Sequence, residues 1–126
     1  MEIKLRLEDV LKARQTLGMI IDDTELKIDV ILKFRLLGLK TALSPIVSNF
    51  EIIKNEKIIE YGKKNKDGNY QISKNDTKAI DKFTQDLKET LDSSVTVIVD
   101  KIKPGEIFNK GISSEHLEVL YPFIGE

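Results

Sequence analysis

Apolar residues recur at helical spacing through the second quarter of the chain. Their intervals of four and three residues place them on one side of a helix rather than on a strand: Leu32, Leu36, Leu39, Leu43, Ile46, Phe50 and Ile53. Before them, Asp22 to Glu25 combine polar cap candidates with acids, which favours a helix start at about Thr24. The pattern continues to about Gly62, so the sequence predicts one long helix over 24–62.

Pro45 lies in the middle of this predicted helix. Proline in a helix interior costs ~3 kcal/mol and clashes with the carbonyl four residues back, here that of Thr41. Pro45 also suits the first turn of a second helix that Ser44 would cap. The apolar pattern passes through Pro45 without a change of phase, which favours a kinked continuous helix over a break. A continuous helix of this length would extend ~58 Å and project beyond a compact domain.

Other patterns predict the elements around this helix. Residues 3–7 alternate apolar and charged side chains and predict a half-buried strand, followed by a short helix that starts at Glu8 or Asp9. The continuous β-prone segment 95–99 predicts a strand that is covered on both faces. Asn75 or Asp76 begins an amphipathic helix, whose predicted inner face is Ile80, Phe83, Leu87 and Leu91.

The polar connection after the long helix contains Asp67-Gly68, a strong turn signal. It lets the amphipathic helix return along the long one, as an antiparallel helical hairpin over about 24–92. We therefore predict a single α+β domain over 1–126, in which this hairpin packs with a small sheet of two or three strands. The sheet includes 3–7 and 95–99, and two strands alone need cover to be stable in water.

Composition narrows the class of protein. The 126 residues carry twenty basic against twenty-one acidic side chains, so there is no strong global field for nucleic acid or membrane. The absence of cysteine excludes a disulfide scaffold, a thiolate zinc site and a cysteine nucleophile. No stretch reaches the ~18 apolar residues that span a bilayer, and the first residues do not resemble a signal peptide. We expect a cytoplasmic protein without membrane contact.

The sequence offers no catalytic constellation. His116, the single histidine, lies in the first turn of a short predicted helix without a nucleophile motif beside it. The turn around Gly68 resembles a calcium loop in spacing, but Lys63 and Lys74 occupy the first ligand position and the bidentate acid position. We therefore predict a protein that is not an enzyme and holds no metal or cofactor.

The first half of the long helix is apolar on almost every side between Ile28 and Val47. Such a helix is either buried within one chain or covered by another copy. Because one or two short helices cannot bury so much apolar surface, we predict a homo-oligomer. The candidate interface residues are Ile28, Leu32, Leu36, Leu39 and Leu43.

Two groups of cations are weaker binding candidates. Arg14, Arg35 and Lys40 could anchor a nucleotide or signalling ligand if they face a shared cleft, and the last two interrupt the apolar helix. Three lysines lie near the predicted hairpin tip, interleaved with two possible stacking tyrosines, Tyr61 and Tyr70. The lysines are Lys63, Lys64 and Lys66. Acidic residues stand among them, so we expect no binding to DNA or RNA.

From Phe50 onward the chain resembles a family of small proteins from phages and prophages of low-GC Gram-positive bacteria. The segment Glu60 to Tyr70 (EYGKKNKDGNY), the acidic helix after it and the strand from Val95 carry the resemblance, which covers about two-thirds of the chain. Pro45 departs from the uninterrupted helix that the family implies. The family has no assigned activity, so it implies no functional residue.

These observations together predict a function. We expect a non-enzymatic, phage-encoded interaction protein in the host cytoplasm that binds a host or phage macromolecule, for example to inhibit a host process such as antiviral defence. Two alternatives stay open: an oligomeric binder that sequesters a nucleotide or signalling ligand, and a nucleic-acid-binding accessory protein.

Overall fold

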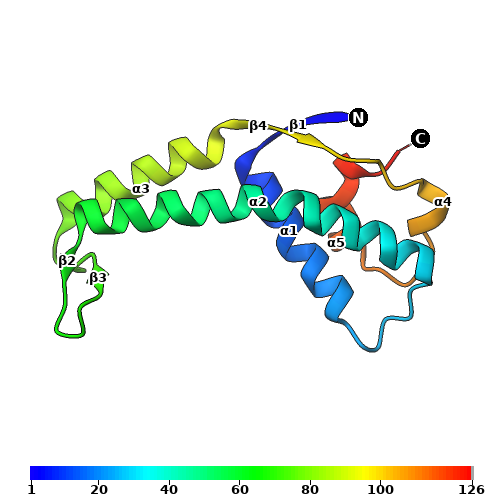
Figure 1. Cartoon of the computed structure of the whole chain (residues 1–126), viewed down its shortest axis with the longest axis horizontal. Helices are drawn as coiled ribbons and strands as arrows, with labels where there is room; N and C mark the ends of the chain where they lie inside the picture. The colour runs from blue at the N-terminus through cyan, green and yellow to red at the C-terminus, as the bar shows by residue number, and fades with distance from the viewer. Residues whose placement is uncertain (126) are drawn as a thin grey trace.

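The computed structural model describes residues 1–125 and has an α+β fold, as predicted (Figure 1). Its elements are β1 (Glu2–Arg6), α1 (Leu7–Asp22), α2 (Val30–Tyr61), β2 (Lys63–Lys64), β3 (Tyr70–Gln71), α3 (Thr77–Asp92), β4 (Ser94–Ile98), α4 (Pro104–Ile107) and α5 (Ser114–Leu120). A 3-10 turn (Tyr121–Phe123) follows. In Figure 1 the second half of α2, β2, β3 and α3 project from the remainder. We call residues 46–92 the arm and the remainder the body.

The long helix α2 begins at Val30, six residues later than predicted. Asp29 is its cap, since the Asp29 carboxylate accepts a hydrogen bond from the Leu32 N–H at 2.8 Å. This bond, together with an ion pair to Lys110 at 3.1 Å, lowers the pKa of Asp29. Asp23 instead accepts from the Glu25 N–H and orders the turn after α1. The acids around Asp23 therefore end one helix rather than start the next.

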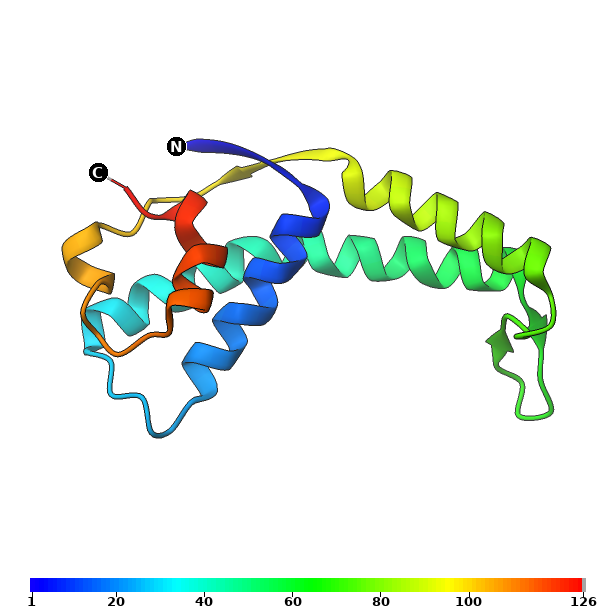
Figure 2. The ribbon, with the colours of Figure 1, turned by 180° about the vertical axis from the view of Figure 1, so that it is seen from behind.

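Helix α2 is continuous through Pro45, which confirms the prediction of an unbroken helix. In Figure 2 its two halves are not collinear, and the axis changes direction near the middle. Pro45 cannot donate to the Thr41 carbonyl, and two nearby hydroxyls bond back to carbonyls one turn earlier. Ser44 Oγ donates to the Lys40 carbonyl at 2.7 Å and Thr41 Oγ1 to the Leu37 carbonyl at 2.9 Å. The bend therefore has local causes.

The strands β1 and β4 form a two-stranded antiparallel sheet in which Ile3 lies opposite Val97 and Lys4 opposite Thr96. Both strands lie one residue earlier than predicted. Val97 is 2% exposed and faces the core, whereas Ile98 is 73% exposed. The prediction that this strand is covered on both faces is therefore wrong for a single chain, because Ile98 on the second face is largely exposed.

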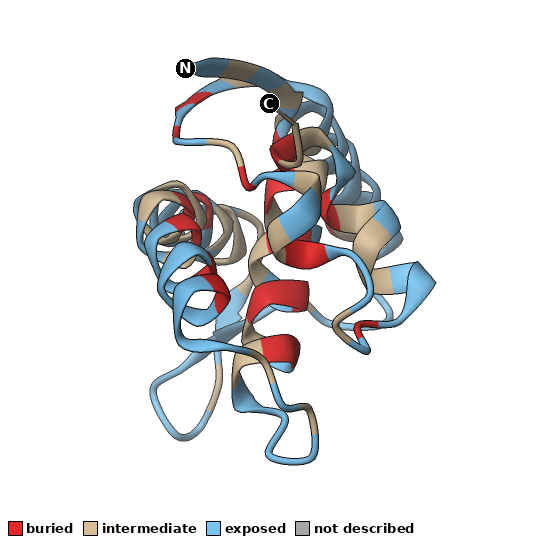
Figure 3. Ribbon diagram, turned by 90° about the vertical axis from the view of Figure 1, so that its right-hand side faces the viewer, coloured by how far each residue is buried: buried red, intermediate tan, exposed pale blue. Residues whose placement is uncertain are grey.

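The core of the body lies between α1, the first half of α2, β4 and the C-terminal helices (Figure 3). The inner side of α1 packs against the buried side of α2 through Val10, Ala13, Leu17 and Ile20. The last buried residue of α2 is Phe50. The arm has a smaller core. Phe50 and Ala79 are buried there, and the predicted inner face of α3 is half-buried: Ile80, Phe83, Leu87 and Leu91. Apolar packing therefore stabilises both parts of the chain, and less of it is fully buried in the arm.

The predicted helical hairpin is present, with α3 beside the second half of α2 (Figures 1 and 2). At its tip, β2 and β3 pair antiparallel, Lys64 opposite Tyr70. The turn between them is ordered by Asn65, whose side-chain oxygen accepts from the Asp67 and Asn69 N–H groups at 2.9 and 3.0 Å. Gly68 supplies the positive φ of 84° that this turn requires.

Two substitutions two residues apart on α2 distinguish its two sides. Leu36 is fully buried, so Leu36→Ala removes core contacts and should lower the free energy of unfolding by about 2–5 kcal/mol. Phe34 is 70% exposed in a single chain, so Phe34→Ala should change the monomer's stability by about 0.5 kcal/mol or less. Urea unfolding followed by circular dichroism, at a concentration that keeps the chain monomeric, measures both. Equal losses would contradict the assigned orientation of α2.

Candidate interaction surface

The structure places the predicted interface residues inside one chain. Leu32, Leu36, Leu39 and Leu43 are at most 3% exposed, and Ile28 packs partly buried against the same core. Their cover is α1 and the C-terminal segment of the same chain, so they cannot meet a second copy while the chain is folded. The stripe on α2 that was predicted as an interface is part of the core of a single chain, so any contact between copies has to use other side chains.

Another set of apolar side chains lies on the opposite side of α2. We call them the outer face, and their exposed fractions are 84% for Val30, 62% for Ile31, 70% for Phe34 and 41% for Leu37. Each of Val30, Phe34 and Leu37 stands two residues before a buried leucine, about 200° away around the helix. The body half of α2 is therefore apolar on both sides and covered on one. Contiguous exposed apolar side chains of this kind mark interaction sites.

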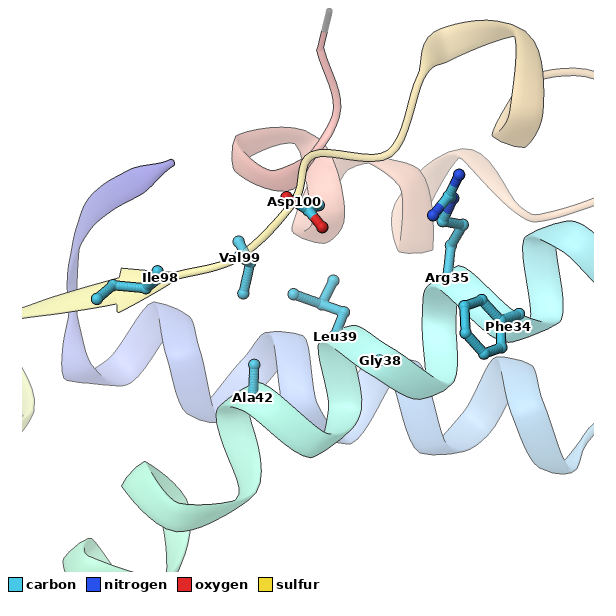
Figure 4. A pocket seen from close by; sticks show the side chains of 8 residues that line it. All are labelled: Phe34, Arg35, Gly38, Leu39, Ala42, Ile98, Val99 and Asp100. Carbon is cyan, nitrogen blue, oxygen red and sulfur yellow. The ribbon is translucent and has the colours of Figure 1, made fainter.

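A groove of about 260 Å³ separates α2 from the end of β4 (Figure 4). Its lining residues are Phe34, Arg35, Gly38, Leu39, Ala42, Ile98, Val99 and Asp100. Phe34 contributes one exposed apolar wall and Ile98 another, while Arg35 and Asp100 bring opposite charges to the same end. The groove thus joins the outer face of α2 to β4.

Within residues 1–125, no strand pairs with the edge of β4 that faces away from β1, and we call it the open edge. The Val99 N–H bonds to the Met1 carbonyl at 3.1 Å, and the Leu7 N–H bonds to the Ser93 carbonyl at 2.9 Å. In an antiparallel pair, hydrogen-bonded residues alternate with residues whose backbone groups point away from the partner strand. Residues 93, 95, 97 and 99 therefore bond to β1, and Ser94, Thr96 and Ile98 direct their N–H and C=O groups to the open edge.

The cations predicted to anchor a ligand do not converge. Arg35 Nε lies 3.4 Å from Glu106 Oε2 and lines the groove between α2 and β4. Arg14 Nε donates to Ser44 Oγ at 3.1 Å and lines a different depression, between α1 and α2. Lys40 lines neither. Within the part of the chain that the structure describes, these three side chains therefore do not converge on one depression that could hold a phosphate.

The predicted nucleic-acid candidates lie at the tip of the arm. Lys63 and Lys64 form β2, and Lys66 is in the turn, all three exposed. Of the two tyrosines, Tyr70 is 43% exposed, but the Tyr61 hydroxyl donates to Asp86 Oδ2 at 2.5 Å and ties α2 to α3. The pair of stacking side chains that the spacing indicated is therefore reduced to one.

Tyr61 belongs to a polar cluster that holds the arm together. Lys57 Nζ lies 2.9 Å from Glu60 Oε2, 3.6 Å from Asp86 Oδ2 and 5.9 Å from the centre of the Tyr61 ring. The hydrogen bond to Asp86, with desolvation, raises the pKa of Tyr61 above its ordinary 10.0. A raised pKa keeps the phenol protonated at neutral pH, which suits a structural donor rather than a base.

The described residues contain neither a cluster of metal ligands nor a helix that could span a membrane. Within residues 1–125 no group of three or more histidine or acidic side chains is placed to hold a metal ion. None of the helices in that part of the chain combines the length and apolar character needed to cross a bilayer. Protein-family models, curated protein sequences and solved structures show no match to the chain. The phage-family resemblance stays a prediction.

The Tyr61–Asp86 hydrogen bond predicts a local pH effect. Because the folded pKa of Tyr61 is raised, its stabilising contribution is complete below pH 10.0 and is lost as the pH rises through the folded value. The ultraviolet titration difference between the wild type and Tyr61→Phe should therefore have a midpoint above pH 10.0. Tyr61→Phe should also speed amide exchange in α3 at neutral pH while α1 is unchanged. A midpoint at or below the ordinary value would contradict the bond.

Proposed function

We propose that this chain is a non-enzymatic interaction protein that binds a host or phage protein through its arm. The observation that carries the proposal is the exposure of Ile52 and Ile59, 57% and 53%, on an arm that projects from the body. The two isoleucines are seven residues apart and lie on the same side of α2. Paired aliphatic anchors on one helix face are the usual means by which a helix docks in a groove of a partner.

The anchors point away from the chain's own helix α3. Lys57 and Tyr61, which contact Asp86 of α3, lie roughly half a helical turn around α2 from Ile52 and Ile59. Nothing in the hairpin therefore needs these isoleucines for its own packing. Polar neighbours such as Asn55 and Glu56 are exposed beside them and form the rim that interfaces have around an apolar centre.

The arm is held in one shape before any partner arrives. The cluster around Tyr61 joins α2 to α3, and Asn65 fixes the turn at the tip. A preorganised surface loses less conformational entropy when it binds, which favours affinity from a small contact. A role in binding thus fits the combination of few core residues and many specific polar contacts.

The resemblance to phage proteins supports a host or phage origin for the partner and a place in the host cytoplasm. Inhibition of a host process such as antiviral defence is one form of the same proposal. The alternative in which the protein sequesters a nucleotide has less support, because Arg14, Arg35 and Lys40 do not share a cleft. The nucleic-acid alternative has lost Tyr61 as a free stacking side chain.

Affinity capture from a Gram-positive host lysate tests the proposal. The Ile52→Glu, Ile59→Glu double variant places two charges on the side of α2 that is proposed to bind the partner. It should abolish capture of a partner protein that the wild type captures. Both side chains are exposed, so the variant should keep the wild-type circular dichroism spectrum.

Met19→Glu provides the matched control. Met19 is 50% exposed, but it lies on α1 in the body, outside both the arm and the outer face of α2. Met19→Glu should leave partner capture intact. Capture that survives the arm double variant, or that only Met19→Glu removes, would contradict the arm as the binding element.

A further inference from the structure

We propose that a second copy of this chain covers the open edge of β4 and the outer face of α2. The two copies would be related by a two-fold axis through Thr96. The paired β4 strands would run antiparallel and join the two sheets into one of four strands, in the order β1-β4-β4-β1. This contact uses the body and is independent of the arm.

The hydrogen-bonding groups of this edge are complementary to themselves. Ser94, Thr96 and Ile98 direct their backbone groups outward at every second residue. In an antiparallel pair about Thr96, Ser94 faces Ile98 of the partner subunit, and Thr96 faces Thr96 of the partner subunit. Pairing would satisfy these outward groups and turn a two-stranded ribbon, which is marginal alone, into a sheet of ordinary size.

Charge distinguishes this edge from the other one. The free edge of β1 carries Glu2, Lys4 and Arg6, all exposed, and charged side chains on an edge oppose pairing with another strand. The residues of β4 on the outer side of the sheet are Ser94, Thr96 and Ile98, none of them charged. A residue on a two-fold axis meets its own copy, so a neutral side chain such as Thr96 is required there, whereas Lys4 would face a like charge.

The outer face of α2 supplies the area that a stable dimer needs. A standard interface buries about 800 Å² on each partner, more than three residues of strand edge can provide. Phe34 and Ile98 line one groove, so a copy that pairs with β4 also reaches Phe34 (Figure 4). The four exposed residues of the outer face extend this contact along α2. The same event therefore covers the strand edge and the apolar side of the helix.

The mass of the full chain in solution tests the proposal. Light scattering after size exclusion, over a range of micromolar concentrations, should give twice the monomer mass of 14.4 kDa. Thr96→Lys places two positive charges at the two-fold axis and should weaken the dimer at least about tenfold. Thr96→Pro removes the outward N–H of the edge but no bond to β1, and should also give a monomer.

Lys4→Pro is the matched control, because Lys4 lies opposite Thr96 and directs its backbone to the other edge of the sheet. It should leave the dimer intact. Circular dichroism and the unfolding temperature establish that each variant is folded, and the exposed position of Thr96→Lys keeps the test valid if either proline variant unfolds.

A wild type that stays monomeric, or a dimer that Thr96→Lys leaves unchanged, would overturn the proposal. A monomer that binds an extended peptide at β4 would also overturn it and would assign the edge to another protein. If the Thr96 variants lose the dimer but still capture the partner, the function proposed for the arm stands. If the arm double variant loses capture but still dimerises, the dimer proposal stands.

Discussion

The packing of one side of α2 on α1 is the constraint on which the rest of the molecule depends. Leucines at positions 32, 36, 39 and 43 are buried there, and β4 and the C-terminal segment close over the same core. Once this side is used, the helix cannot also bury Val30 and Phe34, which point the opposite way. The exposed outer face is thus a direct consequence of how the core forms, because a helix has only one side to offer each neighbour.

Beyond Pro45 the kind of stabilisation changes. The body depends on buried aliphatic side chains, whereas the arm combines half-buried apolar side chains of α3 with hydrogen bonds and charges around Tyr61, Lys57 and Asp86. Contacts that remain partly exposed contribute modestly, since water competes for them. The arm therefore keeps its shape through many modest contacts rather than through one continuous core.

Helical periodicity was enough to predict α2, its continuity through Pro45 and the hairpin with α3. The alternation over residues 3–7 and the β-prone segment 95–99 predicted the two strands. Sequence pattern was insufficient where two signals had the same chemistry. Asp23 and Asp29 both resemble helix caps, and only tertiary context shows that Asp29 begins α2. The residues predicted as an interface are core residues of a single chain, because the regular stripe with Leu36 indicates burial but does not identify its cover. The outer face with Phe34 has a comparable apolar signal, and which side meets α1 depends on contacts between residues distant in sequence.

The two proposed contacts gain from each other when they occur together. One arm offers two isoleucine anchors, a small contact whose affinity is limited by the cost of ordering and orientation. A body that dimerises presents two such arms on one rigid particle, so binding of the first arm raises the effective concentration of the second at a symmetric or repeated partner. The rigidity of the arm matters in this case, because a flexible arm would lower the effective concentration of the second arm at the partner. A modest surface on a small chain can therefore bind tightly without a larger core, provided that the dimer and the partner share a compatible spacing.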